Sequence, residues 1–273
     1  MHEYWDSVAS ALPRSPVYSL FGRTVAPYWR VERRLAVHLS LSHAPPIPEG
    51  ARSLVLKTDL WNEGMDSSSG DVFALLPGGG EAVEVVGIDC SPVVCDVARH
   101  GMSCHGAAIA CADVSALPFK GESFDVVLDL STLDHIPPTH TSQVIAEYQR
   151  VLKRGGVVAL VFDATTYRWQ RYLQRAFNRA RYSEVAQYQM WWRLSPLRVK
   201  CIIRESGLSL LHESPMGILS MSPLLVRVAG SSMIRKAFVG PLYRSGLDAR
   251  LTRLSRYLFP LSSQYLFVAR KPG

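Results

Sequence analysis

The residues best placed to bind a ligand are two aspartates, each of which ends a short apolar run. Asp89 follows the run 83–88, and Asp113 follows the run 107–112. Such runs predict strands, and the carboxyl ends of parallel strands are where ligands bind in open α/β sheets. Each carboxylate oxygen accepts one hydroxyl proton, so Asp89 suits a vicinal diol, while Asp113 suits an exocyclic amine.

Asp134 and His135 are the nearest candidates for proton transfer. They follow the apolar run 124–130. The ordinary pKa of histidine lies near neutrality, so His135 is the expected base and Asp134 its partner. In the alternative interpretation, His135 is a packing residue or the start of a helix. Both interpretations stay open at this point.

The elements that must position these residues can be read from the apolar pattern. The run 124–130 indicates a buried strand, and apolar residues at helical spacing over 141–152 indicate a helix with a Thr or Ser cap that ends at Gly155. The continuous apolar run 157–162 is typical of a parallel strand covered on both faces. Strand, crossover helix and strand make one right-handed unit of a doubly wound sheet.

The same alternation extends upstream. Residues 53–56 indicate a first strand. Ser91 and Pro92 supply an N-cap and a first helical residue for a helix over 93–100, which ends at Gly101. The chain therefore predicts an α/β fold with a mostly parallel sheet.

Four segments of this pattern resemble the motifs of a known family, the class I S-adenosylmethionine-dependent methyltransferases. VVGIDCSP is similar to the family's second motif, CADVSALPF to its third, FDVVLDLSTLDHI to its fourth and EYQRVLKRGG to its RVLKPGG turn. The resemblance covers residues 53–163 and is strongest to the group related to ubiquinone and menaquinone biosynthesis methyltransferases. It implies a Rossmann-like seven-stranded sheet, S-adenosyl-L-methionine as cofactor and methyl transfer as the reaction.

The resemblance also assigns residues to the cofactor. Asp89 would bind the ribose hydroxyls, and Cys90 would lie beneath the adenine. Asp113 and Val114 would contact the adenine edge. Three consecutive residues would line the cleft beside the methionine part: Asp129, Leu130 and Ser131. The alternative for Asp89 is an ordinary capping acid at the start of the following helix.

The first motif departs from the family pattern, in which a glycine-rich loop lets backbone amides approach the cofactor. Here the first strand continues as Lys57, Thr58 and Asp59, and glycine appears only at Gly64. The chain resembles a methyltransferase subgroup with KTDL in this place and STLDH in the fourth motif. We hypothesise that Asp59 accepts from the methionine ammonium while Lys57 or Thr58 meets the carboxylate. The alternative is a degenerate loop in a non-catalytic scaffold protein.

Composition agrees with a globular enzyme. The chain has 273 residues, of which 48% are hydrophobic, enough for one elaborated α/β domain. Five cysteines fit a reducing compartment, and none has companions at zinc spacing, so we expect no metal. The sequence has no signal-peptide pattern and no apolar run long enough to span a bilayer. We expect a cytoplasmic protein.

Charge is divided unevenly along the chain. Up to Ala164 there are 12 Lys and Arg against 19 Asp and Glu, whereas from Thr165 onward there are 18 against 4. Residues 167–193 interleave arginines with aromatic side chains. Such a segment binds nucleic acid in some proteins, as an RNA methyltransferase would require, but more often it is a solvated helix face. We do not expect nucleic acid as the partner.

Two interpretations of the basic half remain. It is a lid over a small or lipophilic acceptor, such as a natural product, a quinol, a phenol or a lipid, or it also makes peripheral contact with an anionic membrane. The sequence leaves the acceptor and the oligomeric state open.

The expected organisation has six parts. They are an N-terminal helical cap (1–50), the cofactor-binding core (51–164), an aromatic and basic cap (165–194), a helix with strand six (195–212), a helical lid insertion (213–263) and a final strand (264–273). The resemblance implies that the last two strands of this chain are antiparallel members of the sheet.

Overall fold

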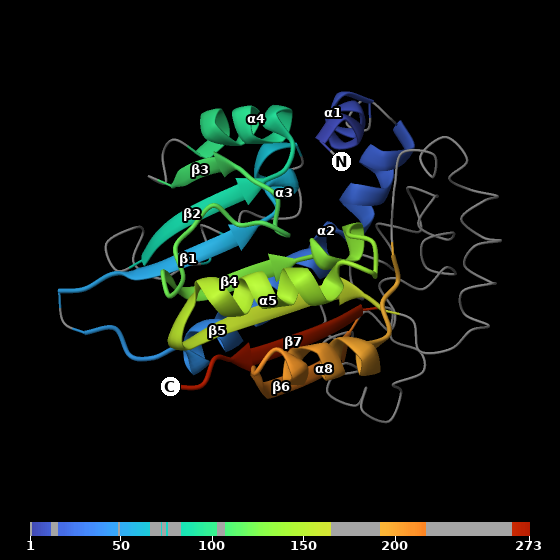
Figure 1. Ribbon diagram of the computed structural model, residues 1–273. Coiled ribbons are helices and arrows are strands. Elements are labelled where there is room, and N and C mark those ends of the chain that lie inside the picture. The colour runs from blue at the N-terminus through green and yellow to red at the C-terminus, as the bar shows by residue number, and fades with distance from the viewer. Residues whose placement is uncertain are drawn as a thin grey trace.

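Seven strands form one twisted sheet, seen in Figure 1 with helices on both faces. The computed structural model describes residues 2–11, 16–48, 50–65, 72, 75, 83–102, 107–164, 192–216 and 264–273. The strands are β1 Ser53–Thr58, β2 Val83–Asp89, β3 Ala108–Cys111, β4 Phe124–Leu130, β5 Leu152–Asp163, β6 Ser209–Met216 and β7 Gln264–Arg270. Most of the expected aromatic cap and of the lid insertion lies outside the described residues.

The sheet order is β3-β2-β1-β4-β5-β7-β6. Strands β1 to β5 are parallel, and β7 runs antiparallel to both of its neighbours, β5 and β6. The predicted seven-stranded Rossmann-like sheet is therefore confirmed. The expectation that both of the last strands are antiparallel is wrong for β6. The chain crosses over from β5 to β6 through a helix, which keeps β6 parallel to β5, and β7 then fits between them.

Helices cover the two faces in separate groups. They are α1 His2–Ala11, α2 Pro16–His43, α3 Trp61–Gly64, α4 Pro92–Met102, the 3-10 helix η6 Leu133–His135, α5 Thr141–Val151 and α8 Pro196–Glu205. Side chains of α1, α2 and α4 share one apolar cluster with the sheet, and those of α5 and α8 share the other. None of the helices that the structure describes is both long enough and apolar enough to cross a membrane.

The local signals at the helix ends were only partly correct. Ser91 caps α4 as predicted, because its Oγ accepts from the Val94 amide at 3.3 Å. Helix α5 begins at Thr141, but the capping position is His140, which makes no side-chain cap bond. Gly155 does not end this helix. It has a φ of 78° and lies within β5, which starts directly after the helix.

Asp125 joins three central strands. Its Oδ2 accepts from the Leu54 amide of β1 at 2.8 Å and from Nζ of Lys153 in β5 at 2.8 Å. A strand-start acid with two internal donors has a structural role. It also helps to fix the register of the strands that carry the candidate site.

Replacing Asp125 with Ala should lower the free energy of unfolding by about 1–2 kcal/mol, because a part-buried amide loses its acceptor. Urea denaturation measures this change. The matched control is Asp96→Ala, since Asp96 forms only an exposed ion pair with Arg99 at 3.9 Å and should change stability by less than about 0.5 kcal/mol. Equal effects of the two substitutions would contradict the assignment.

Candidate functional site

The candidate site lies at the carboxyl edge of the sheet, where β1 and β4 are neighbours. From β1 the strands continue outward to β2 and β3, and from β4 they continue to β5 on the other side. A ligand cleft is expected at such a switch point. Asp89 and Asp129 lie at the ends of their strands, as predicted, and Asp59 directly follows β1.

The ammonium group of Lys57 is buried at the end of β1 and is neutralised within the protein. Its Nζ lies 3.1 Å from Oε2 of Glu63 in α3, and the two side chains are 1% and 0% exposed. Nζ also donates a hydrogen bond to the Asp59 carbonyl. The other carboxylate oxygen, Oε1 of Glu63, accepts from the Val72 amide at 3.4 Å. Strand, turn and helix are thus tied together by one lysine.

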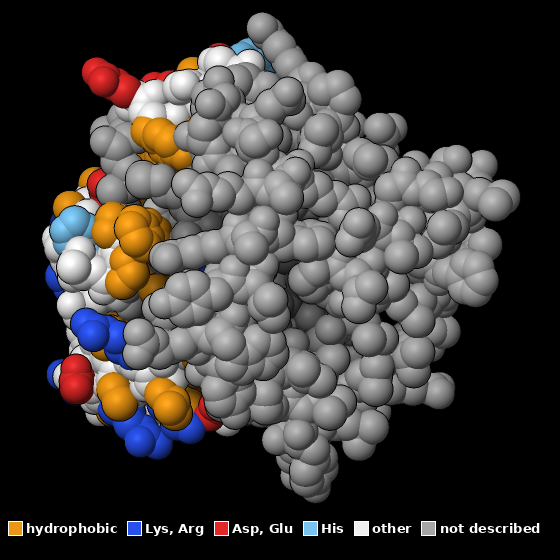
Figure 2. Space-filling model, turned by 90° about the vertical axis from the view of Figure 1, so that its right-hand side faces the viewer, with side chains coloured by type: hydrophobic (Ala, Val, Ile, Leu, Met, Phe, Trp, Pro, Cys, Tyr) orange, Lys and Arg blue, Asp and Glu red, His pale blue; other side chains and the backbone are white. Residues whose placement is uncertain are grey.

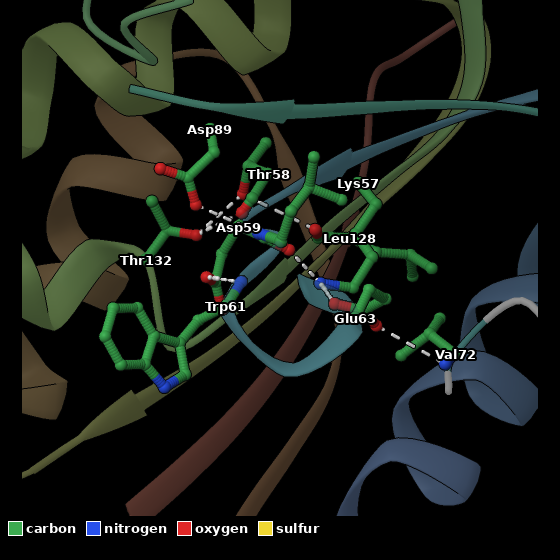
Figure 3. Close-up of polar contacts among 10 residues, drawn as sticks. Lys57, Thr58, Asp59, Trp61, Glu63, Val72, Asp89, Leu128 and Thr132 are labelled. Carbon is green, nitrogen blue, oxygen red and sulfur yellow. Dashed lines mark hydrogen bonds and ion pairs between the residues drawn. The ribbon is translucent and has the colours of Figure 1, made fainter. Parts of the chain in front are cut away.

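This ion pair points away from the other polar groups of the site. Figure 3 shows Lys57 and Glu63 on one side of the strand end, and Asp89 and Trp61 on the other. Glu63 was not among the residues selected from the sequence. The strand period gave a signal for Lys57 alone, because Lys57 follows Val55 at a spacing of two and points to the same face of the sheet. Nothing in the sequence marked Glu63 as its partner.

The connection between β1 and α3 is held by its own hydrogen bonds. Asp59 has a φ of 131°, a conformation that favours glycine. Its amide donates to the Ile88 carbonyl at 2.9 Å, and its Oδ1 accepts from the Trp61 amide at 2.9 Å. The Leu60 amide donates to Oδ2 of Asp89 at 3.1 Å. Three successive amides are therefore used within the protein.

Asp89 connects this turn to the start of α4. Its second oxygen, Oδ1, accepts from the Ser91 amide at 2.8 Å. Burial, followed by the charge of Asp59, raises the pKa of Asp89 to about 7, although its two backbone hydrogen bonds oppose the shift. Asp89 therefore holds the turn before α4, whereas the cap of this helix is Ser91.

A second network joins β1 to the end of β4. Oγ1 of Thr132 donates to the Thr58 carbonyl at 2.6 Å and lies 2.9 Å from the Thr58 hydroxyl. Asp129 is fully buried. Its Oδ1 accepts from the amides of Thr132 and Leu133 at 2.8 and 3.2 Å, and its Oδ2 accepts from the Tyr148 hydroxyl at 2.8 Å. Burial raises the pKa of Asp129 to about 6.

The other two residues expected beside the methionine part differ in exposure. Leu130 is buried in the core. Ser131 is partly exposed and has a φ of 76°, and its amide donates to the Val161 carbonyl at 2.8 Å. Of Asp129, Leu130 and Ser131, therefore, only Ser131 presents surface at the sheet edge.

The residues expected around the adenine lie beyond β2 and β3. Cys90 directly follows β2, and burial raises the pKa of its thiol. The neighbouring thiol of Cys111 lies 3.5 Å from the Cys90 carbonyl. Asp113 is partly exposed, but its Oδ1 already accepts from the amide and the hydroxyl of Ser115 at 2.8 and 2.7 Å. Val114 is buried.

Asp134 lies at the β4 and β5 side of the site and is only 2% exposed. Among the residues that the structure describes, none forms a hydrogen bond with its Oδ1. Burial, followed by the charges of Asp163 and Asp129, raises the pKa of Asp134 well above its usual range. Asp163, at the end of β5, lies 3.5 Å from the guanidinium of Arg193. Within the described residues, no group of three or more His, Cys, Asp or Glu side chains is arranged to hold a metal ion.

The N-terminal helix α1 packs over the same edge. Trp5 meets His135 edge to face, with the ring centroids 5.0 Å apart. Asp6 accepts a hydrogen bond from the Ser91 hydroxyl at 2.5 Å. Sequence reasoning expected N-terminal helices over the cleft but did not select Trp5 or Asp6. Their proximity depends on how α1 docks between α4 and η6, which local patterns do not encode.

Comparison with known families indicates which kind of protein has this fold and site. Residues 66–160 match the sequence model of a methyltransferase domain. The chain is similar to methyltransferases over this segment, which supports methyl transfer as its activity. A Streptomyces coelicolor methyltransferase of this fold was solved with S-adenosyl-L-homocysteine, which supports S-adenosyl-L-methionine as the cofactor that the resemblance implied. No curated protein matches the chain.

Solved structures share the fold of this methyltransferase at low sequence identity. Geranyl diphosphate C-methyltransferase from Streptomyces coelicolor is 16% identical, with a TM-score of 0.59, and the match covers 97% of this chain and 88% of that one. A Haloferax volcanii methyltransferase, solved with the Trm112 methyltransferase activator, is 17% identical with a TM-score of 0.57, and the match covers 100% and 99% of the two chains.

The same fold also occurs in an enzyme named for a different reaction. The [4+2]-cyclase SpnF is 18% identical, with a TM-score of 0.53, and the match covers 88% of this chain and 80% of the cyclase. The fold alone therefore does not fix the reaction, and the acceptor of the methyltransferase has to be argued from the site.

The buried acids of the methyltransferase should make it less stable as the pH rises. Their native pKa values lie above the unfolded value, so the native state binds protons more tightly, and this stabilisation is lost as the pH rises from about 4 through the raised native values. Asp134→Asn removes one such acid. It should raise the free energy of unfolding at about pH 8 and have a smaller effect at about pH 5.

Urea denaturation at the two pH values measures this difference. Glu122→Gln is the control, because Glu122 is half exposed and should give the same small change at both pH values. A pH-independent effect of Asp134→Asn would contradict a raised pKa of the Asp134 carboxyl in the native state.

Proposed function

We propose that this methyltransferase moves a methyl group from S-adenosyl-L-methionine to a small or lipophilic acceptor by direct in-line displacement. A natural product, a quinol or phenol, or a lipid would serve as acceptor. The observation that carries the proposal is the pair of carboxylates, Asp59 and Asp89, tied to the same turn at the switch point of the sheet. Carboxylates at this place suit a ligand that offers hydroxyl groups and positive charge.

The cofactor supplies a methyl group that its sulfonium already activates, so the protein needs mainly to bind and orient. We assign Asp89 to the ribose hydroxyls and Asp59 to the methionine ammonium. Cys90, Asp113 and Val114 are assigned to the adenine side. The close approach of the loop backbone that glycines would allow is not required in this arrangement.

We propose a different role for three residues that the sequence indicated as cofactor contacts. Lys57 and Thr58 have internal partners for their polar groups, and so does Asp129. We propose that they position the turns that hold Asp59 and Ser131. The methionine carboxylate then meets no charge from Lys57, because that charge is neutralised by Glu63.

At the acceptor end, His135 is the proposed base, with Asp134 beside it. A base is needed only if the attacking atom must lose a proton. The imidazole of His135 is partly exposed and is oriented by its edge-to-face contact with Trp5. Asp134 is proposed to remain protonated and to donate a hydrogen bond, because burial and two nearby acids disfavour its charge.

A non-catalytic binding protein with this fold is the second candidate. One observation favours it: the amides of the β1–α3 turn, which a glycine-rich loop would offer to the cofactor, are already bonded internally. Contact with membrane or nucleic acid would depend on the basic second half, most of which lies outside the described residues. Membrane contact stays a prediction from the sequence, and nucleic acid is not expected as a partner.

Calorimetric titration with S-adenosyl-L-methionine and S-adenosylhomocysteine tests the first step. We expect binding of both, and Asp89→Ala should weaken it by at least about tenfold because the ribose loses its acceptor and the turn its anchor. Asp96→Ala, on the exposed face of α4, should leave affinity unchanged. Absence of binding to the unaltered protein would overturn the enzyme assignment in favour of a scaffold.

A methyl-transfer screen against quinols, phenols and glycolipids tests the second step. With an acceptor found in this way, His135→Ala should lower turnover by about a hundredfold or more while cofactor affinity stays the same, as expected for loss of a general base. Unchanged turnover would remove His135 from the catalytic assignment and leave it as a packing partner of Trp5.

A further inference from the structure

Two consecutive residues of helix α1 contact opposite halves of the candidate site. Oδ1 of Asp6 accepts a hydrogen bond at 2.5 Å from the hydroxyl of Ser91, at the start of α4. The ring of Trp5 lies edge to face with that of His135, with the centroids 5.0 Å apart and the planes at 86°. Ser91 belongs to the half proposed for the cofactor, and His135 belongs to the half proposed for the acceptor. Helix α1 therefore bridges the two halves.

We propose that Asp6 and Trp5 are positioning residues through which occupancy of the cofactor half orders the proposed base. Asp6 docks α1 on the turn that Asp89 holds, and Trp5 on the docked helix orients the imidazole of His135. A cofactor bound at Asp89 then prepares His135 before an acceptor arrives. This inference rests on the proposed function and adds to it how the two halves of the site are coupled.

Ser91 is the residue on which α1 is docked. It is fully buried, its amide donates to Oδ1 of Asp89 at 2.8 Å, and its hydroxyl accepts from the Val94 amide while it donates to Asp6. A hydrogen bond to a carboxylate is stronger than one between neutral groups. A ligand that fixes Asp89 therefore also fixes the hydroxyl that holds Asp6.

The buried side of α1 holds Trp5 in place. Val8 and Ala9 are buried, and Ala9 belongs to the apolar cluster that includes residues of α4 and the sheet. Trp5 precedes them by three and four positions, so the three side chains lie on the same side of the helix. Figure 1 shows α1 next to α4, beyond the carboxyl ends of β1 and β2. Tyr4 also meets the Trp5 ring edge to face, at 5.3 Å.

The orientation of His135 matters for the proposed reaction. The residue is partly exposed and ends the three-residue helix η6. A general base must lie within hydrogen-bond reach of the proton that it removes, and an exposed side chain samples several rotamers. Edge-to-face contact between two rings has a preferred geometry. Trp5 therefore favours one orientation of the imidazole as long as α1 is docked.

Amide hydrogen exchange tests the coupling without an acceptor. Saturation with S-adenosylhomocysteine should slow the exchange of the α1 amides by about fivefold or more, and leave that of the α8 amides unchanged. Asp6→Ala should remove most of this slowing. Because coupling is reciprocal, the same variant should weaken S-adenosylhomocysteine binding by a factor that approaches the slowing in the unaltered protein. Asp6→Asn keeps an oxygen that accepts from Ser91 and should restore both.

Turnover tests the role of Trp5, with an acceptor found in the screen. Trp5→Leu should lower kcat by about tenfold, because the base is no longer held in one orientation, while the affinity for S-adenosylhomocysteine changes less than about twofold. Trp5→Phe keeps a ring and should restore most of the turnover. Ser7→Ala, at an exposed position of the same helix, should change neither quantity. A purely structural role would lower turnover and affinity together.

The outcomes separate the two proposals. If the unaltered protein does not bind S-adenosylhomocysteine, the proposed function fails. If it binds without slower exchange in α1, or if Asp6→Ala keeps the full slowing, the proposed function stands and the coupling through α1 is overturned. Unchanged kcat in Trp5→Leu would also overturn the proposal. If the screen finds no acceptor, the exchange experiment decides.

Discussion

The candidate site depends on the neutralisation of one buried ammonium group. Lys57 stands at the end of the central strand β1, where burial without a partner would be prohibitive. Glu63 provides the partner, and to do so α3 must follow β1 after a very tight turn. That turn fixes the unusual backbone of Asp59 and brings the Leu60 amide to Asp89. The geometry of this edge of the sheet thus depends on the buried charge of Lys57, which is paired with Glu63 and does not contact the ligand.

Acidic groups dominate the edge that this turn completes. Asp59, Asp89, Asp129 and Asp163 lie at or directly after the ends of four neighbouring parallel strands, and burial raises the pKa of Asp89 and Asp129. Packing carboxylates so closely is unfavourable for the protein alone, so the arrangement makes sense for a ligand that brings hydroxyl donors and positive charge. The cofactor of the methyltransferase domain has both.

The sheet could be predicted from the sequence because its signals are local. Apolar runs mark β2, β4 and the end of β5, and Ser91 with Pro92 marks the start of α4. The direction of β6 could not be predicted in this way, because it depends on β7 inserting between β5 and β6. The end of α5 was also mispredicted, because Gly155, with a φ of 78°, lies within β5 and does not end the helix.

The site was predictable in position but not in its internal bonding. Strand ends placed Asp89 and Asp129 at the correct edge. Sequence reasoning gave Lys57 a ligand-facing role, because its partner Glu63 is identified only when α3 is seen to fold back on the strand. Likewise, the hydroxyl of Tyr148 in α5 donates to Asp129, a contact that the apolar spacing of this helix does not indicate.

The most direct measurement is a crystal structure of this protein with S-adenosylhomocysteine bound. The account predicts that the turn from Lys57 to Glu63 is unchanged, that their ion pair stays intact, and that the ribose hydroxyls bind Asp89. The account would be contradicted if the turn opened, Lys57 left Glu63 to meet the methionine carboxylate, and the amides of residues 59–61 turned toward the ligand.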